Sequence, residues 1–80
     1  MAKNQNIVHQ YFKKKLADGT MILVKVNPIH YTGSEITRLP GGKTEMRDLE
    51  FDEEVFDDLK ADDFEACNPL EFNLYLSGLA

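Results

Sequence analysis

The chain has few residues that could cross-link it, either covalently or through a metal. Its 80 residues include a single cysteine, Cys67, which has no partner for an internal disulfide. The sequence also contains no Cys/His cluster with the spacing of a zinc site. A chain of this length buries only about 60% of its unfolded surface, so association with another chain is a common source of stability. We therefore expect one small domain over residues 1–80, with no metal and no cofactor.

Long apolar runs are absent too. The longest, residues 21–24 (Met-Ile-Leu-Val), is far shorter than the roughly 20 residues that cross a bilayer. Residues 1–6 lack the apolar segment of a signal peptide, and we expect them to form a flexible N-terminus. The apolar fraction of 42% is normal for a globular protein. These features predict a soluble, cytoplasmic protein that does not contact a membrane.

Positive charge is scarce in the second half of the chain. Residues 1–47 hold eight Lys and Arg against three Asp and Glu, whereas residues 48–80 hold Lys60 alone against eleven Asp and Glu. Such asymmetry is typical of an interaction surface. It is equally consistent with an acidic half that folds back onto a basic one, and the sequence leaves both alternatives open.

The first half of the chain has the pattern of two β-hairpins. Residues 7–16 and 21–26 flank residues 18–19 (Asp-Gly), which predict a two-residue turn that pairs Leu16 with Met21. Large apolar side chains then occur on both faces of the hairpin. We therefore expect both faces to be covered, by a helix from the second half or by a second subunit.

The second hairpin is predicted from residues 35–39 and 44–51, joined by a Pro-Gly-Gly-Lys sequence that suits a type II turn. Residues 32–34 (Thr-Gly-Ser) are expected to end a short extended piece that precedes it. The predicted register places Glu35 opposite Asp48, an unfavourable pair of like charges, so we expect the strands to fray there.

A change of pattern at Asp52 predicts helical structure in the rest of the chain. Asp52 can cap a helix, after which apolar residues recur at helical spacing with acids between them. Residues 69–77 alternate as a strand does, but Asn68-Pro69 is typical of a helix start, and we favour the helix. The predicted fold is α+β: an antiparallel sheet of about four strands from two hairpins, which can curl like a small barrel, followed by one or two C-terminal helices.

Motifs for catalysis or phosphate binding are incomplete. Residues 41–44 (Gly-Gly-Lys-Thr) resemble the end of a phosphate-binding loop, but Thr37 stands where that loop needs its first glycine. His9 and His30 are the only histidines, and we expect them to be half-buried packing residues. We therefore predict that the protein is not an enzyme. A catalytic or small-ligand site around either histidine is a minor alternative.

Two segments are candidates for binding. The leading hypothesis is a small non-enzymatic interaction or assembly module, whose partner is another protein or a second copy of the chain in a homodimer. Its surface would mix apolar and acidic residues that suit a basic partner: Val55, Phe56, Asp57, Asp58 and Leu59.

The alternative hypothesis is a nucleic-acid-binding β-domain that uses the first hairpin, with the acidic C-terminal half modulating it. Exposed aromatic rings and lysines on a strand can stack on bases and neutralise phosphates. The residues concerned are Tyr11, Phe12, Lys13, Lys14, Lys15 and Lys25. A net charge of −5 disfavours this alternative, and lysines on a strand also protect a sheet edge.

Overall fold

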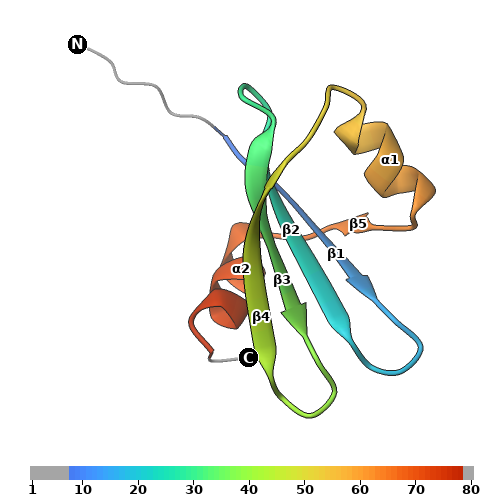
Figure 1. The fold of residues 1–80 in the computed structure, drawn as a ribbon, viewed down its shortest axis with the longest axis vertical. Helices are drawn as coiled ribbons and strands as arrows, with labels where there is room; N and C mark the ends of the chain where they lie inside the picture. The colour runs from blue at the N-terminus through green and yellow to red at the C-terminus, as the bar shows by residue number, and fades with distance from the viewer. Residues whose placement is uncertain (1–7, 79–80) are drawn as a thin grey trace.

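The fold is an open antiparallel sheet with one helix on each side. A computed structural model of the chain describes residues 8–78, in which five strands have the order β4-β3-β2-β1-β5 (Figure 1). The elements are β1 (Gln10–Lys15), β2 (Met21–Asn27), β3 (Thr32–Arg38), β4 (Thr44–Glu50), α1 (Val55–Ala61), β5 (Glu65–Ala66) and α2 (Pro69–Leu76). The predicted α+β class is confirmed. The sheet does not close into a barrel, and the flexible N-terminus predicted at residues 1–6 lies outside the described residues.

The first hairpin has a three-residue turn, so the predicted register is wrong by one position. The Leu16 N–H donates to the Thr20 carbonyl at 2.8 Å, and the Gly19 N–H donates to the Leu16 carbonyl at 3.0 Å. A two-residue turn of the predicted kind needs positive φ at both positions. Here Gly19 has φ +96° but Asp18 does not enter the left-handed region. Lys15, rather than Leu16, is therefore paired with Met21.

The second hairpin repeats this construction and the same one-residue error. The Leu39 N–H donates to the Lys43 carbonyl at 2.8 Å, and Gly42, with φ +96°, takes the left-handed position. Glu35 therefore lies opposite Arg47, and the Arg47 Nε donates to its carboxylate at 2.8 Å. The fraying predicted from two opposed carboxylates does not occur, because the true cross-strand pair has opposite charges.

Strand β3 begins where the sequence predicts an end. Residues 32–34 belong to the strand, and the segment before them, predicted as extended, is a turn in which the Asn27 side chain accepts the N–H groups of Ile29 and His30. Gly33 is at this position because a Cβ there would overlap the Lys25 carbonyl oxygen of β2. The glycine permits a close approach of two backbones instead of breaking the strand.

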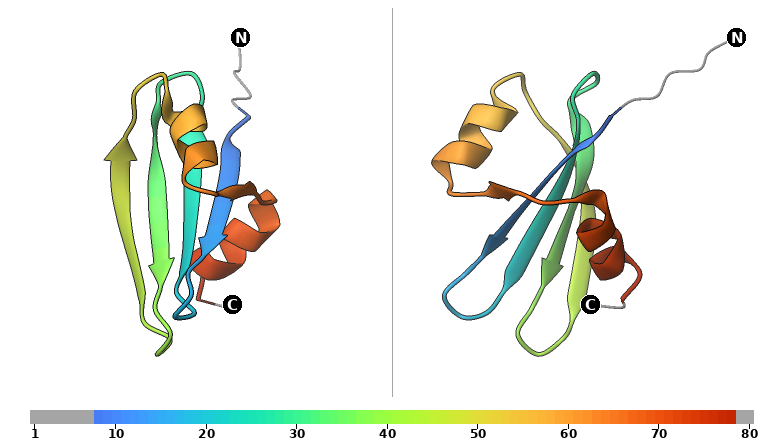
Figure 2. Two further views of the ribbon diagram at one scale, coloured as in Figure 1. Left: turned by 90° about the vertical axis from the view of Figure 1, so that its right-hand side faces the viewer. Right: turned by 180° about the vertical axis from the view of Figure 1, so that it is seen from behind.

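Both faces of the sheet are covered, as predicted, and the cover comes from this chain (Figure 2). We name the faces after their helices. The buried core of the α1 face consists of Val24, Val26, Val55 and Leu59. The buried core of the α2 face consists of Leu23, Ile36 and Phe72. Neighbouring residues of β2 thus serve opposite cores, because side chains alternate across a strand.

The two helices begin differently. The Asn68 side chain accepts the Glu71 N–H at 2.8 Å, with Pro69 as the first helical residue, so residues 69–76 are helical and the strand alternative is excluded. Asp52 accepts the Glu54 N–H at 2.9 Å in a turn, and α1 starts at Val55, two residues later than a helix capped by Asp52 would. Phe72, 2% exposed, anchors α2 to the sheet.

Candidate functional site

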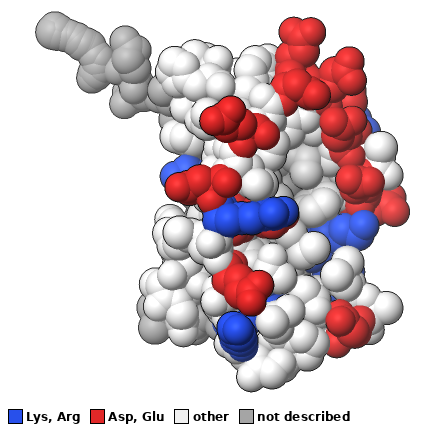
Figure 3. Space-filling model, viewed as in Figure 1, with Lys and Arg blue, Asp and Glu red and all other residues white. Residues whose placement is uncertain are grey.

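The segment predicted to bind a partner is divided between the core and the surface. Val55 and Leu59 are 4% and 8% exposed in the core of the α1 face. Phe56 also faces the sheet, with its ring centroid 5.9 Å from that of Phe12. The acidic side chains remain outside, and Figure 3 shows them gathered along the region of α1. This helix therefore offers a partner negative charge but little apolar surface.

The aromatic residues of the first hairpin are packed against the helices. The Tyr11 ring lies 5.3 Å from that of Phe72 on the α2 face, whereas Phe12 contacts Phe56 on the α1 face. A stacking platform for bases needs exposed rings on one surface. The structure does not bring these two aromatic residues together.

The lysines of the same hairpin are dispersed as well. Lys13 donates to both Glu71 oxygens, at 3.0 and 3.1 Å, and this hydrogen bond raises the pKa of the lysine. On the opposite face Lys14 lies over the Phe64 ring, 5.8 Å from its centroid. Lys15 is exposed at the end of β1, and Lys25 lies in a hollow described below. No single surface collects the six predicted residues.

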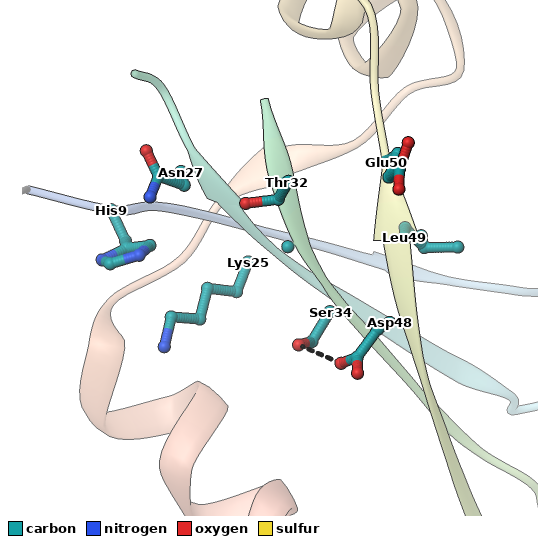
Figure 4. A pocket seen from close by; sticks show the side chains of 9 residues that line it. His9, Lys25, Asn27, Thr32, Ser34, Asp48, Leu49 and Glu50 are labelled. Atoms are coloured by element: carbon teal, nitrogen blue, oxygen red, sulfur yellow. Dashed lines mark hydrogen bonds between the residues drawn. The ribbon is translucent and has the colours of Figure 1, made fainter. Parts of the chain in front are cut away.

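Helix α2 leaves part of its face of the sheet open, and a hollow of about 460 Å³ lies there (Figure 4). The Ser34 hydroxyl donates to the Asp48 carboxylate at 3.2 Å across β3 and β4. The lining is mixed in charge and rich in hydrogen-bonding groups: His9, Lys25, Asn27, Thr32, Gly33, Ser34, Asp48, Leu49 and Glu50. Such a surface suits polar side chains or an extended backbone.

The histidines and the cysteine do not form a reactive group. His9 is half-buried at the edge of the hollow, and within the described residues it makes no hydrogen bond to Ser34 or Asp48. His30 is exposed in the turn between β2 and β3, so its predicted role as a packing residue is wrong. Cys67 packs against the core of the α2 face, and burial raises the pKa of its thiol, which disfavours the reactive thiolate.

Strand β4 is an open sheet edge that the sequence analysis did not identify as a site. Its side chains are exposed except for half-buried Leu49, and in residues 8–78 no strand pairs with its outer side. The opposite edge differs, because β5 pairs with β1 at Phe12 and Lys13. Met46 is 55% exposed on β4. A long, exposed edge of this kind can accept a further strand.

The orientation of the β4 backbone follows from hydrogen bonds at its two ends. The Lys43 carbonyl accepts from Leu39, and the Phe51 N–H donates to the Tyr31 carbonyl at 2.7 Å. Backbone groups of alternate residues point to opposite sides of an antiparallel strand. The odd-numbered residues of β4 therefore bond to β3, and the N–H and C=O groups of the even-numbered ones point outward: Thr44, Met46, Asp48 and Glu50.

Two further absences concern the described residues only. No three His, Cys, Asp or Glu side chains of residues 8–78 are arranged to hold a metal ion. Neither helix in this range has the length and hydrophobicity to cross a membrane.

Comparison of the chain with protein-family models, with curated proteins and with solved structures finds no match.

Proposed function

We propose that this chain is a non-enzymatic protein-interaction module that binds its partner by strand addition at β4. The observation that carries the proposal is the open edge itself. Within residues 8–78 no strand pairs with the backbone donors and acceptors that Met46 and its even-numbered neighbours direct to the outer side of β4. An extended segment placed there would form main-chain hydrogen bonds, which supply affinity whatever its side chains are.

The hollow on the α2 face supports the same proposal. Alternate side chains of an added strand project to the two faces of a sheet. Those on the α2 face would lie beside Asp48 and the polar lining of the hollow, which begins at β4 and extends to Lys25. Specificity would come from these polar contacts. Helix α1 would contribute a negative field rather than an apolar contact.

The alternative function predicted from the sequence is nucleic-acid binding by the first hairpin. The described structure contains no arrangement of residues that favours it. Both aromatic residues that would stack on bases, Tyr11 and Phe12, are packed against helices. Lys13 is engaged with Glu71.

A proline substitution tests strand addition. In Met46→Pro the lost N–H points outward, so the β3–β4 ladder keeps its bonds, while an added strand loses a donor and meets the proline ring. Met46→Ala is the matched control, because it removes the same side chain but keeps the N–H. Circular dichroism and thermal unfolding establish that each variant folds. Asp48→Pro, also at an outward position, is the second variant should Met46→Pro unfold.

The binding measurement uses tagged full-length chain in host lysate, with and without nuclease, and identifies proteins and nucleic acids. We expect a discrete protein, or more of the same chain, on the wild type and Met46→Ala, with at least tenfold less on Met46→Pro. A protein held equally by all three would overturn strand addition at β4. Nucleic acid recovered only without nuclease would overturn the proposal in favour of the hairpin alternative.

A further inference from the structure

We infer that the strand added to β4 is the β4 of a second copy, in an antiparallel register with Met46 on the two-fold axis. This inference rests on the proposed function and names the partner. It follows from the direction of the backbone groups along β4 and from the order of charges on the strand.

The backbone restricts the registers that are available. Outward-pointing residues of one β4 must face outward-pointing residues of the other, because only these have free N–H and C=O groups. The two-fold axis must therefore pass through a residue of β4 and not between two residues. Of the five positions nearest the middle of β4, an axis at Leu49 places Asp48 opposite Glu50 of the partner subunit, two like charges. Four positions remain to be compared: Glu45, Met46, Arg47 and Asp48.

Charge distinguishes these four registers. An axis at Glu45, at Arg47 or at Asp48 places that residue opposite its own copy, so two like charges meet directly. An axis at Met46 places Glu45 opposite Arg47 of the partner subunit, twice by symmetry. Like charges that face each other across strands are destabilising and opposite charges are stabilising. Only the register centred on Met46 brings opposite charges together.

The other positions of this register also match. Thr44 lies opposite Asp48 of the partner subunit, where its hydroxyl can donate to the carboxylate, and the two Met46 side chains, each 55% exposed, cover one another. In this register Glu45 and Arg47 fall at pairs that do not exchange backbone hydrogen bonds, where opposed side chains are closest. The ionic pairs therefore form at the positions where distance favours them.

The existing contacts of β4 prepare it for this arrangement. The Arg47 Nε already bonds to Glu35 at 2.8 Å, yet the side chain is 69% exposed, and a guanidinium carries further N–H donors that could bind a second carboxylate. A row of Glu35, Arg47 and Glu45 of the partner subunit would alternate in charge across the joined sheets. The Glu45 side chain is 58% exposed, and its ion pair with Lys43 is long, at 3.6 Å. Its carboxylate can therefore turn toward Arg47 of the partner subunit.

The place of β4 in the fold leaves room for a second copy. Helix α2 packs over β2 and β3, and among the described residues neither hydrophobic core includes a residue of β4. Figure 1 shows β4 at the margin of the sheet. Charges on an edge strand ordinarily prevent self-pairing. On β4 they oppose three registers and favour the fourth, so the same residues select one dimer.

Charge reversal tests the register. Sedimentation of the full chain measures the mass of the wild type, of Glu45→Arg, of Arg47→Glu and of the double variant. We expect the wild type to form a dimer and each single variant to raise the dimer Kd about tenfold or more, because like charges then meet twice. The two single variants mixed should form a heterodimer, and the double variant should recover the dimer. Glu53→Arg, with the same change of charge in the exposed turn before α1, should leave the dimer unchanged.

Cross-linking gives a second measurement of the same register. Across a hydrogen-bonded antiparallel pair the Cα atoms are about 5.5 Å apart, within the range of a disulfide. In a Cys67→Ala background, Met46→Cys should therefore form a disulfide-linked dimer on oxidation. Thr44→Cys should not link to itself, but it should link to Asp48→Cys when the two are mixed.

The outcomes separate this inference from the proposed function. A monomer at all concentrations, or a dimer without the rescue and cross-linking pattern, overturns self-pairing at Met46. If a different protein is still lost in Met46→Pro, strand addition survives with another partner. A dimer that forms equally in Met46→Pro and in both charge variants overturns the inference, and if Met46→Pro also loses no other protein, the proposed function is overturned with it.

Discussion

The substitution of Gly33 by alanine tests the close approach of β2 and β3. Gly33 is half-buried in β3, opposite Val26. An added Cβ would overlap the Lys25 carbonyl oxygen, would lie 2.9 Å from the carbonyl carbon, and would lie 3.0 Å from the Cε2 atom of the Phe51 ring. The ring can turn aside, but the carbonyl is main chain in the middle of the sheet. The two strands would therefore have to separate.

The expected cost follows from two opposing effects. Overpacking typically costs about 1–3 kcal/mol of folding free energy. Because the added Cβ of Gly33→Ala would meet backbone atoms, which move less easily than a side chain, we expect a cost of about 3 kcal/mol. Alanine reduces the freedom of the unfolded chain, which offsets about 0.4–1 kcal/mol of this. The net loss is therefore about 2 kcal/mol or slightly more. For a domain of this length that corresponds to a fall in Tm of about 10–15 °C.

Urea and thermal unfolding followed by circular dichroism measure this difference. Gly41→Ala is the matched control, because its Cβ would meet nothing within 4 Å and its φ lies outside the left-handed region. We expect the control to be neutral or slightly stabilising, by up to about 1 kcal/mol. If Gly33→Ala were as stable as the control, the β2–β3 approach deduced at Gly33 would be refuted.

Three further predictions concern packing, pH and capping. Phe72→Ala should lower the free energy of unfolding by about 3–5 kcal/mol, whereas Leu70→Ala, at a side chain 67% exposed on the same helix, should change it by less than about 0.5 kcal/mol; urea titration compares them. The hydrogen bond from the Thr20 N–H lowers the pKa of Asp18 below its ordinary 3.8. The ionised Asp18 carboxylate therefore stabilises the fold above pH 3.8, and this stabilisation is lost as the pH falls through the lowered pKa. Asp18→Asn should therefore lose less stability than the wild type between pH 6 and pH 2, and equal losses would contradict this. Asn68→Ala should destabilise the protein by about 1 kcal/mol through loss of the α2 cap, and Asn68→Asp should not.

The fold class was predictable because local signals agree with it. Asp18-Gly19 and Pro40-Gly41 lie between segments with strand composition, and Asn68 followed by a proline is typical of a helix start. These signals act over a few residues and do not depend on the rest of the chain. The need for cover on both faces also followed from the hairpin alone, since both of its faces carry apolar residues.

The candidate site was not predictable, because it depends on which strand is left at the edge. The alternation of charge in Glu45, Arg47 and Asp48 is visible in the sequence, but it is typical of any solvated strand. In the same way, Val55 and Phe56 could pack equally well against a partner or against the chain's own sheet. In the folded chain they pack against the sheet. Burial is a property of the whole arrangement, so residue type alone could not distinguish the two.

The one-residue error in the hairpin turns shows how local geometry determines the proposed surface. In both turns a single glycine takes the left-handed position, at Gly19 and Gly42, and the turn gains a residue. At the second turn this brings Arg47 opposite Glu35 and directs the N–H of Met46 away from β3. Had the predicted register formed, Glu35 would face Asp48, and the bond between Glu35 and Arg47 would be lost. The outward direction of the Met46 backbone groups, which the register centred on Met46 requires, thus depends on the conformation of Gly42.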